Sequence, residues 1–115
     1  MEGCIFCMIA SGEVPVPFVY EDAHVVAFND AEPQAPVHVL VVPRSHHACL
    51  GDAVPAEVSA ALCAAVPKVA EIAGIATSGY RTVINCGPDA RQSVQHLHLH
   101  VLGGAQMGHG MVSFE

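Results

Sequence analysis

Hydrophobic and polar positions along the chain follow two different periods. Short, apolar and largely β-branched stretches occur at residues 18–22, 24–30, 37–43 and 80–86. Such runs, bounded by turn residues and prolines, are typical of strands. From Pro55 to Ile72 apolar residues recur at spacings of three and four, which places them on one face of a helix. We therefore expect one long helix among several strands.

The two ends of the pattern complete the predicted order of elements. Residues 4–12, CIFCMIASG, predict a short helix or turn that ends at Gly12, and residues 94–104, VQHLHLHVLGG, predict a last strand. Pro67 lies inside the long helical pattern and predicts a kink or a break there. Strands and helices do not alternate, so we expect an α+β fold with a mainly antiparallel five-stranded sheet.

Size and charge narrow the classes of function. The chain has 115 residues, of which 52% are hydrophobic and 13% charged, and residues 1–115 are expected to form a single domain. The formal net charge is −7, with four Lys and Arg in total. Polymeric nucleic acid is an improbable partner for such a chain, because its binding depends on many basic contacts. A single phosphate can still be bound by backbone N–H groups and histidines.

Membrane insertion and a disulfide framework are not expected. No apolar run approaches the roughly 20 residues that cross a bilayer. The first residues, MEGCIFCMIASGE, lack the basic start of a signal peptide, so we expect a cytoplasmic protein without a membrane partner. An odd count of five cysteines argues against structural disulfides in that compartment. The spacing of Cys49, Cys63 and Cys86 suggests no function, and we interpret them as small buried hydrophobes.

Alternating histidines in the last predicted strand point to chemistry. His96, His98 and His100 share one face of a strand, while Leu97 and its apolar neighbours share the other. Imidazoles roughly 6.5–7 Å apart along a strand do not readily converge on one metal ion. Catalysis is favoured, because a neutral imidazole can act as nucleophile, base or acid near neutral pH. A polar surface and a metal site are the lesser alternatives.

Cys4 and Cys7 form a C-x-x-C motif near the start of the chain. In a cytosolic protein this spacing is compatible with redox chemistry, with metal binding or with no function. The flanking residues show no thioredoxin-like β-α-β pattern, which disfavours the redox alternative.

Several motifs together resemble the histidine triad (HIT) family. HLHLHVL matches its H-x-H-x-H pattern, and YEDAHVVAFND, PQAPVHVLVVPRSH and VINCGPDARQSVQHLHLHVLGG resemble the rest of the domain. The resemblance covers almost the whole chain and is greatest to the Hint branch, in its bacterial form with an N-terminal C-x-x-C. It implies a compact HIT-like α+β fold and a homodimer in which the two sheets continue across the interface.

The resemblance also implies an activity. Relatives of this branch hydrolyse phosphoramidates of purine nucleosides, or acyl-nucleotides, at the α-phosphorus through a nucleotidyl-histidine intermediate, without a metal in the chemical step. A purine mononucleotide or its phosphoramidate is then the expected partner. Two alternatives remain: a dinucleoside polyphosphate hydrolase, and a nucleotide-binding or zinc-containing interaction module with little activity.

The family pattern assigns roles to individual residues. It implies that His98 is the nucleophile and that His100 donates to a phosphoryl oxygen, with His96 and His38 completing the cluster. Ser93 is implied to contact the leaving group or a phosphate oxygen. The remaining nucleotide-binding residues implied are Asp30 for the ribose hydroxyls, Asn85 near the ribose or the phosphate, and Gln92 as a donor to the phosphate. An apolar slot for the base is implied from Ile5, Phe6, Phe28 and Leu40, with core packing as the alternative for those four.

Two further expectations follow from the same resemblance. A structural zinc ion is implied, held by Cys4, Cys7, His46 and His96, with His47 as an alternative ligand; two thiolates and two imidazoles suit tetrahedral zinc. The family usually has glycine where this chain has Arg91. If that position requires a positive φ, the arginine backbone is strained; alternatively, its charge lies near the phosphate.

Overall fold

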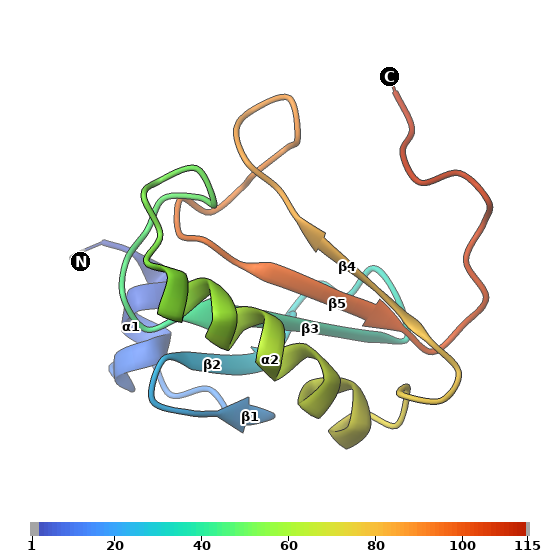
Figure 1. The fold of residues 1–115 in the computed structure, drawn as a ribbon, viewed down its shortest axis with the longest axis horizontal. Helices are drawn as coiled ribbons and strands as arrows, with labels where there is room; N and C mark the ends of the chain where they lie inside the picture. Colours follow the sequence, from blue (N-terminus) through green and yellow to red (C-terminus); the bar gives the residue numbers. More distant parts are fainter. Residues whose placement is uncertain (1–2, 115) are drawn as a thin grey trace.

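Five strands form one antiparallel sheet in the computed structural model, which describes residues 3–114 (Figure 1). In chain order they are β1 (Tyr20–Glu21), β2 (Val25–Asn29), β3 (Val37–Pro43), β4 (Tyr80–Ile84) and β5 (Leu99–Gly103). Their order across the sheet is β1-β2-β3-β5-β4, and every neighbouring pair is antiparallel. The α+β fold with a five-stranded sheet is confirmed.

Two helices pack on opposite faces of this sheet within the described range. The long helix α2 (Ala56–Ile72) lies across one face, as Figure 1 shows, and the short helix α1 (Ile5–Ser11) packs near β3 on the other. β3 serves both faces, because Val39 and Val41 join the cluster under α2 while Leu40 and Val42 join the cluster under α1. Burial on both faces explains why this strand is apolar throughout.

The predicted helix signals hold with one correction. Gly12 ends α1 with φ +84°, where glycine carries no steric penalty, and its N–H donates to the carbonyl of Ile9. The predicted kink or break at Pro67 does not divide α2, which continues through that residue to Ile72. Pro67 is exposed and its neighbours Val66 and Val69 are buried. Packing of the apolar face therefore outweighs the backbone hydrogen bond that proline cannot make.

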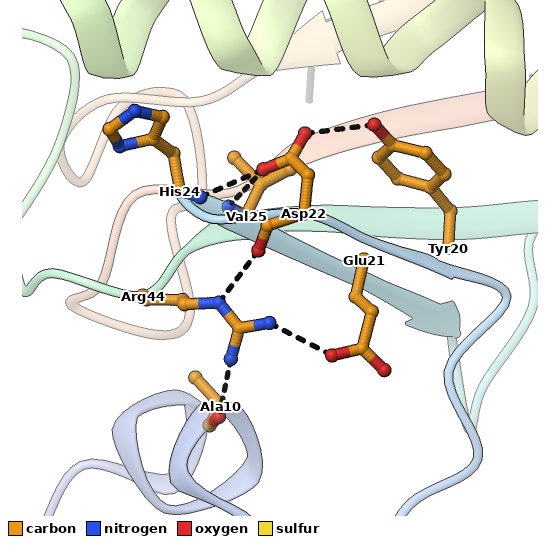
Figure 2. A network of polar contacts seen from close by, with 7 residues as sticks. All are labelled: Ala10, Tyr20, Glu21, Asp22, His24, Val25 and Arg44. Carbon is orange, nitrogen blue, oxygen red and sulfur yellow. Dashed lines mark hydrogen bonds and ion pairs between the residues drawn. The ribbon is translucent and has the colours of Figure 1, made fainter.

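Arg44, directly after β3, ties three segments together (Figure 2). Its guanidinium donates to the carbonyl of Asp22 (2.9 Å), to the carboxylate of Glu21 (2.9 Å) and to the carbonyl of Ala10 (3.4 Å). These contacts link the end of α1 to the turn between β1 and β2. They hold the end of α1, which follows Cys4 and Cys7, against the sheet.

The carboxylate of Asp22 organises the tight turn between β1 and β2 (Figure 2). Its Oδ1 accepts from the backbone N–H groups of His24 (2.8 Å) and Val25 (2.9 Å), and its Oδ2 accepts from the hydroxyl of Tyr20 (2.9 Å). Burial opposes the charged form, but these hydrogen bonds outweigh it and lower the pKa of Asp22. The strands predicted over residues 18–22 and 24–30 pair with each other as the antiparallel hairpin β1–β2.

The last strand is shorter than predicted, and this bears directly on the histidines. β5 begins at Leu99, so His96 and His98 precede it. The N–H of Leu97 donates to the carbonyl of His47 (2.6 Å) instead of joining the ladder, because β3 has ended at Pro43 and β4 ends opposite Leu99. Among the described residues, no helix is both long and apolar enough to cross a bilayer.

Candidate active site and metal centre

The histidine segment keeps the predicted alternation of faces although part of it lies outside β5. Leu97, Leu99 and Val101 belong to the core cluster under α2. On the other side, His96 and His98 are buried, with 0% and 4% of their surface exposed, and His100 is half-buried. The interpretation of this histidine face as a polar surface strand is therefore wrong, because two of its three side chains are inaccessible to bulk solvent.

His98 is oriented by the backbone of its own segment. Its Nδ1–H donates to the carbonyl oxygen of His96 at 2.7 Å, and a carbonyl can only accept, so the ring proton resides on Nδ1. Nε2 of His98 is left with a lone pair. A neutral imidazole fixed in this way presents a nucleophilic nitrogen at a defined position.

His38, on β3, determines which ring nitrogen of His100 carries the proton. The backbone N–H of Gln34 donates to His38 Nδ1 (2.9 Å), so the proton of a neutral His38 resides on Nε2. That Nε2–H donates to Nδ1 of His100 at 2.8 Å. The chain of donors therefore places the remaining N–H of a neutral His100 on its Nε2.

The Nε2 of His100 is a donor that lacks a partner. It is buried and makes no hydrogen bond within the described residues. Burial, followed by the neighbouring charges of His98 and His38, lowers the pKa of His100 to about 4, so the ring is neutral at physiological pH. An unsatisfied buried donor beside a nucleophile fits an anionic ligand, since leaving it unpaired is costly.

Asp30 borders this group on the far side of His38. Its Oδ2 lies 3.4 Å from His38 Nε2, and its Oδ1 accepts the backbone N–H of Glu32 (2.8 Å). Asp30, His38 and His100 are close enough together for a cation to be considered. The hydrogen bond between His38 and His100 already occupies the two ring nitrogens that such a cation needs. The structure thus brings Asp30 next to His38 and His100, and its ribose contact stays a prediction.

Cys4, Cys7, His46 and His96 converge on one point and could hold a metal ion. Their ligand atoms all lie within 4.8 Å of one another. The Sγ–Nδ1 separations are 3.4 Å for Cys4–His96, 3.4 Å for Cys7–His96 and 3.3 Å for Cys7–His46. With Zn–S near 2.3 Å and Zn–N near 2.0–2.1 Å, a tetrahedral site requires separations of about 3.5 Å. The donor set fits zinc in both chemistry and spacing.

His96 has the outer contact that is usual for a metal-binding histidine. Its Nε2–H donates to the carbonyl of Pro43 (2.9 Å), which leaves the Nδ1 lone pair facing the two thiols. Burial lowers the pKa of His96, with the positive charges of other histidines acting in the same direction, and the Pro43 hydrogen bond only partly opposes this. The ring is therefore neutral, as a ligand must be.

The other ligands are positioned by local structure. Cys4 caps α1, and its sulfur accepts the N–H of Cys7 (3.4 Å), so the turn folds both thiols to the same side. Burial and the hydrogen bond with Cys4 raise the pKa of the Cys7 thiol. A metal would therefore have to displace its proton on binding. His47, the alternative ligand, instead contacts the hydroxyl of Ser45 through Nε2 (2.9 Å).

Gln92 has a structural role that differs from the predicted one. Its buried amide donates to the carbonyls of Ala48 (2.6 Å) and Val94 (3.0 Å), and its Oε1 accepts the N–H of Gly87 (3.0 Å). Both amide hydrogens are used within the protein, so the prediction that this side chain donates to phosphate is not supported. It fastens the loop of residues 85–95 to the segment that follows β3.

Arg91 lies in the same loop with φ +59°. Of the two alternatives stated for this position, the positive φ is the one observed, and an arginine backbone is strained there. The side chain of Arg91 lines a groove with Asn85, Asp89 and residues 112–114 of the tail. The strained position therefore lies in the loop of residues 85–95.

Ser93 and Asn85 belong to this loop but line different grooves. Ser93 is exposed and lines a groove of about 420 Å³ together with Cys4, Ile5 and His46. Asn85 lines the separate groove shared with Arg91. The structure brings Ser93 to the metal-cluster side, and the predicted roles of both residues stay predictions.

The apolar residues assigned to a base slot divide into two groups. Phe6, Phe28 and Leu40 are buried, with exposures of 7%, 4% and 5%, and they form the small core cluster under α1. Ile5 is 40% exposed and lines the groove beside Ser93. The ring of Phe6 also packs in a T-shaped arrangement against those of His98 and His96, with ring centroids 5.1 Å and 6.0 Å apart. Core packing, the alternative kept open above, describes the first three.

Two backbone groups that orient the histidine rings could not be predicted from the sequence. The backbone N–H of Gln34 sets the tautomer of His38, and the carbonyl of Pro43 sets that of His96. Both act through the main chain, so their side chains carry no signal. Only the turn-forming composition of residues 31–36 hinted that backbone groups point inward there.

Comparison with known proteins decides the family. Residues 11–107 match the HIT domain family. The chain belongs to the HIT family. It is 41% identical over 110 residues to a purine nucleoside phosphoramidase of Escherichia coli K12, covering 93% of this chain and 92% of the relative. It is 43% identical over 107 residues to a 14 kDa zinc-binding protein of Zea mays, covering 90% and 83%.

Solved HIT structures share the fold over nearly the whole chain. A HIT family hydrolase from Clostridium thermocellum superposes with a TM-score of 0.93 at 44% identity, covering 97% of this chain and 99% of that one. The resemblance read from the histidine segment and its flanking motifs is therefore confirmed, including Cys4 and Cys7 of the N-terminal motif.

Proposed function

We propose that this HIT protein is a hydrolase that cleaves the P–N bond of purine nucleoside 5′-phosphoramidates. The observation that carries the proposal is the pair of imidazole nitrogens in complementary states. His98 offers a lone pair at Nε2, and His100 offers an unpartnered buried N–H at Nε2. A nucleophile beside a fixed donor suits attack on phosphorus with charge developing on its oxygens.

The reaction divides into two displacements. In the first, His98 Nε2 forms a bond to the α-phosphorus, the P–N bond of the substrate breaks, and the leaving amine takes up a proton from solvent, which the attacking water of the second displacement returns. In the second, water attacks the same phosphorus, the bond to His98 breaks, and a nucleoside monophosphate is released. The Nδ1 hydrogen bond to His96 stabilises the positive charge that His98 carries in the intermediate.

His100 serves the transition state as a preorganised donor. Its low pKa keeps it from becoming a general acid, so it stabilises charge through a neutral N–H. His38 holds that N–H in place by occupying the opposite nitrogen. We assign the ribose hydroxyls to the carboxylate of Asp30, which lies beside His38, and the leaving group to Ser93, which is exposed on the loop.

We also propose that the four-residue cluster binds structural zinc. Cys4, Cys7, His46 and His96 would hold the ion, which supplies no chemistry to the phosphoryl transfer because all four tetrahedral positions are filled. Its effect is to tie α1 to the segment that carries His98. The zinc-binding name of the maize relative is consistent with this proposal.

A homodimer is the proposed assembly. β4 is an edge strand of the sheet, and its Tyr80 is 38% exposed. Apolar side chains of the tail are also exposed, notably Met111, Val112 and Phe114. Continuation of the sheet through β4 would cover such surfaces. Light scattering of the purified protein should give the mass of two chains.

Trapping of the intermediate tests the function. Rapid acid quench of the protein with an adenosine 5′-phosphoramidate should yield a covalent nucleotidyl adduct on His98, located by peptide mass analysis. His98→Ala should lose turnover by at least about 10³-fold, because no other group replaces the nucleophile. His24→Ala is the matched control, since His24 is exposed in the turn of Figure 2, and should leave turnover unchanged. Normal activity of His98→Ala would refute the proposal.

The substrate class is tested separately. Rates on the phosphoramidate should exceed those on diadenosine polyphosphates. The reverse order would favour the dinucleoside polyphosphate hydrolase. Nucleotide binding without any adduct would favour a module with little activity.

A further inference from the structure

Cys49 and Cys86, which are far apart in the sequence, are brought together in the fold. The thiol of Cys86 lies close enough to that of Cys49 to be the main cause of the raised pKa of Cys49. Cys49 follows the metal-cluster segment after β3, and Cys86 follows β4 at the start of the loop 85–95. The interpretation of these cysteines as unrelated buried hydrophobes is wrong, since Cys86 is exposed and Cys49 is half-buried.

The backbone around these cysteines gives independent support for their proximity. The side chain of Gln92 bonds the carbonyl of Ala48 at one end and the N–H of Gly87 at the other. Ala48 and Gly87 are the immediate neighbours of the two cysteines. One buried amide thus holds the two backbone segments within the reach of a single side chain, as a disulfide requires.

The remaining cysteines differ from this pair. Cys4 and Cys7 belong to the metal cluster, where bound metal would protect their sulfurs. Cys63 is exposed on α2, on a helix turn that no other described cysteine shares. Cys49 and Cys86 are therefore the cysteines placed both to meet each other and to meet a soluble oxidant.

We propose that Cys49 and Cys86 are a reversible modification site, in which oxidation by a small-molecule disulfide joins them in an intramolecular disulfide. A thiolate of the pair attacks one sulfur of the oxidant, whose S–S bond breaks to release one thiol. The second cysteine attacks the resulting mixed disulfide and releases the other thiol. The two protein sulfurs are oxidised, the two sulfurs of the oxidant are reduced, and the protons pass to the released thiols.

The disulfide would lock the start of the loop 85–95 to the segment that carries His46 and His47. It closes a long stretch of chain that includes all of α2. Closing such a loop restricts the unfolded state, and the melting temperature should rise on the order of 10 °C. This inference does not depend on the proposed hydrolase activity.

Oxidised glutathione is the probe for the test, applied to metal-loaded protein. In the variant Cys63→Ser, cleavage after lysine and arginine places Cys49 within residues 45–68 and Cys86 within residues 82–91, with no second cysteine in either peptide. We expect these two peptides to be linked without reduction and separate after dithiothreitol. The intact protein should lose two hydrogens, and its melting temperature should rise and then return on reduction.

The single variants supply the matched comparison. In the same Cys63→Ser background, Cys49→Ser and Cys86→Ser should each lose the link and the rise in melting temperature, and should instead accumulate a glutathione adduct on the remaining thiol. A link between other cysteines, or persistence of the full response in either variant, would overturn the proposal. Protein of the Cys63→Ser background that stays fully reduced under the same conditions would overturn it as well.

Discussion

His96 and His98 are two positions apart, and both are buried, yet the fold prepares them for different chemistry. His96 donates from Nε2 to Pro43 and directs Nδ1 toward the cysteine pair. His98 donates from Nδ1 to the carbonyl of His96 and leaves Nε2 with its lone pair. The ring nitrogen that carries no proton is therefore Nδ1 in His96 and Nε2 in His98.

The two rings differ in their protonated nitrogen because each donates a hydrogen bond to a different backbone carbonyl. An imidazole has two nitrogens with exchangeable roles, and a single hydrogen bond to a carbonyl decides which one remains basic. The metal cluster uses a carbonyl from β3, whereas the nucleophile uses one from its own segment. In the proposed function, one repeated motif thus contributes to both the structural metal site and the reactive site.

Of the changes that test the difference between the two histidines, removal of a metal ligand should have the largest effect. Cys4→Ser is expected to reduce bound zinc from about one ion per chain to near zero and to lower the free energy of unfolding by at least about 3 kcal/mol, because metal binding is coupled to folding. Elemental analysis and chemical denaturation measure the two effects. Cys63→Ser is the control and should retain both properties within about 0.5 kcal/mol. A Cys4→Ser protein with full zinc content would exclude Cys4 as a ligand.

Removing the donor should affect the reactive site alone. His100→Ala is expected to lower kcat by about 10²–10³-fold, as loss of one preorganised donor does, while zinc content stays unchanged. His100→Gln, which keeps an N–H donor, should recover part of this loss. Steady-state kinetics with metal analysis on the same samples measures both. Equal loss of zinc and activity in His100→Ala would show that the two sites are not separable.

Acid should destabilise the reactive site through His100. The pKa of His100 is lowered to about 4 in the folded chain, below the ordinary value of about 6.5. The unfolded chain therefore binds more protons between these values, and the stability contribution, present above about pH 6.5, is lost as pH falls toward 4. The difference in unfolding free energy between wild type and His100→Gln should change by up to roughly 3 kcal/mol across this window. A constant difference would contradict the lowered pKa.

Relief of backbone strain should give the smallest effect. Arg91→Gly is expected to raise the unfolding free energy by about 0.5–1 kcal/mol, because glycine adopts φ +59° without steric cost. Thermal unfolding at matched metal content measures it. Replacement of an exposed residue with ordinary φ, such as Asp89→Gly, is the control and should not stabilise the protein. A loss of stability in Arg91→Gly would mean that the contacts of the arginine side chain outweigh the strain.

The sequence predicted the fold well because the relevant signals are local. The period of the apolar residues in α2, the β-branched run of β3 and the terminating Gly12 each reflect nearby interactions. The alternation of histidine and leucine likewise separated the core face from the reactive face. Metal-ligand identity came through family resemblance, and the structure then placed the four residues together.

Long-range contacts account for what the sequence did not reveal. The start of β5 depends on where two other strands end, and the role of Gln92 depends on three backbone groups from different segments. The meeting of Cys49 with Cys86 is of the same kind. Each of these features follows from tertiary neighbours, which a single sequence does not specify.

Phe6 lies between the two cysteines of the C-x-x-C motif in the sequence and touches both His96 and His98 through its ring edges. Any loosening of the N-terminal turn would consequently be transmitted mechanically to the nucleophile, without a change in charge. Under the proposed function, loss of zinc would therefore lower turnover before the chain unfolds, because the ring of His98 would be held less rigidly.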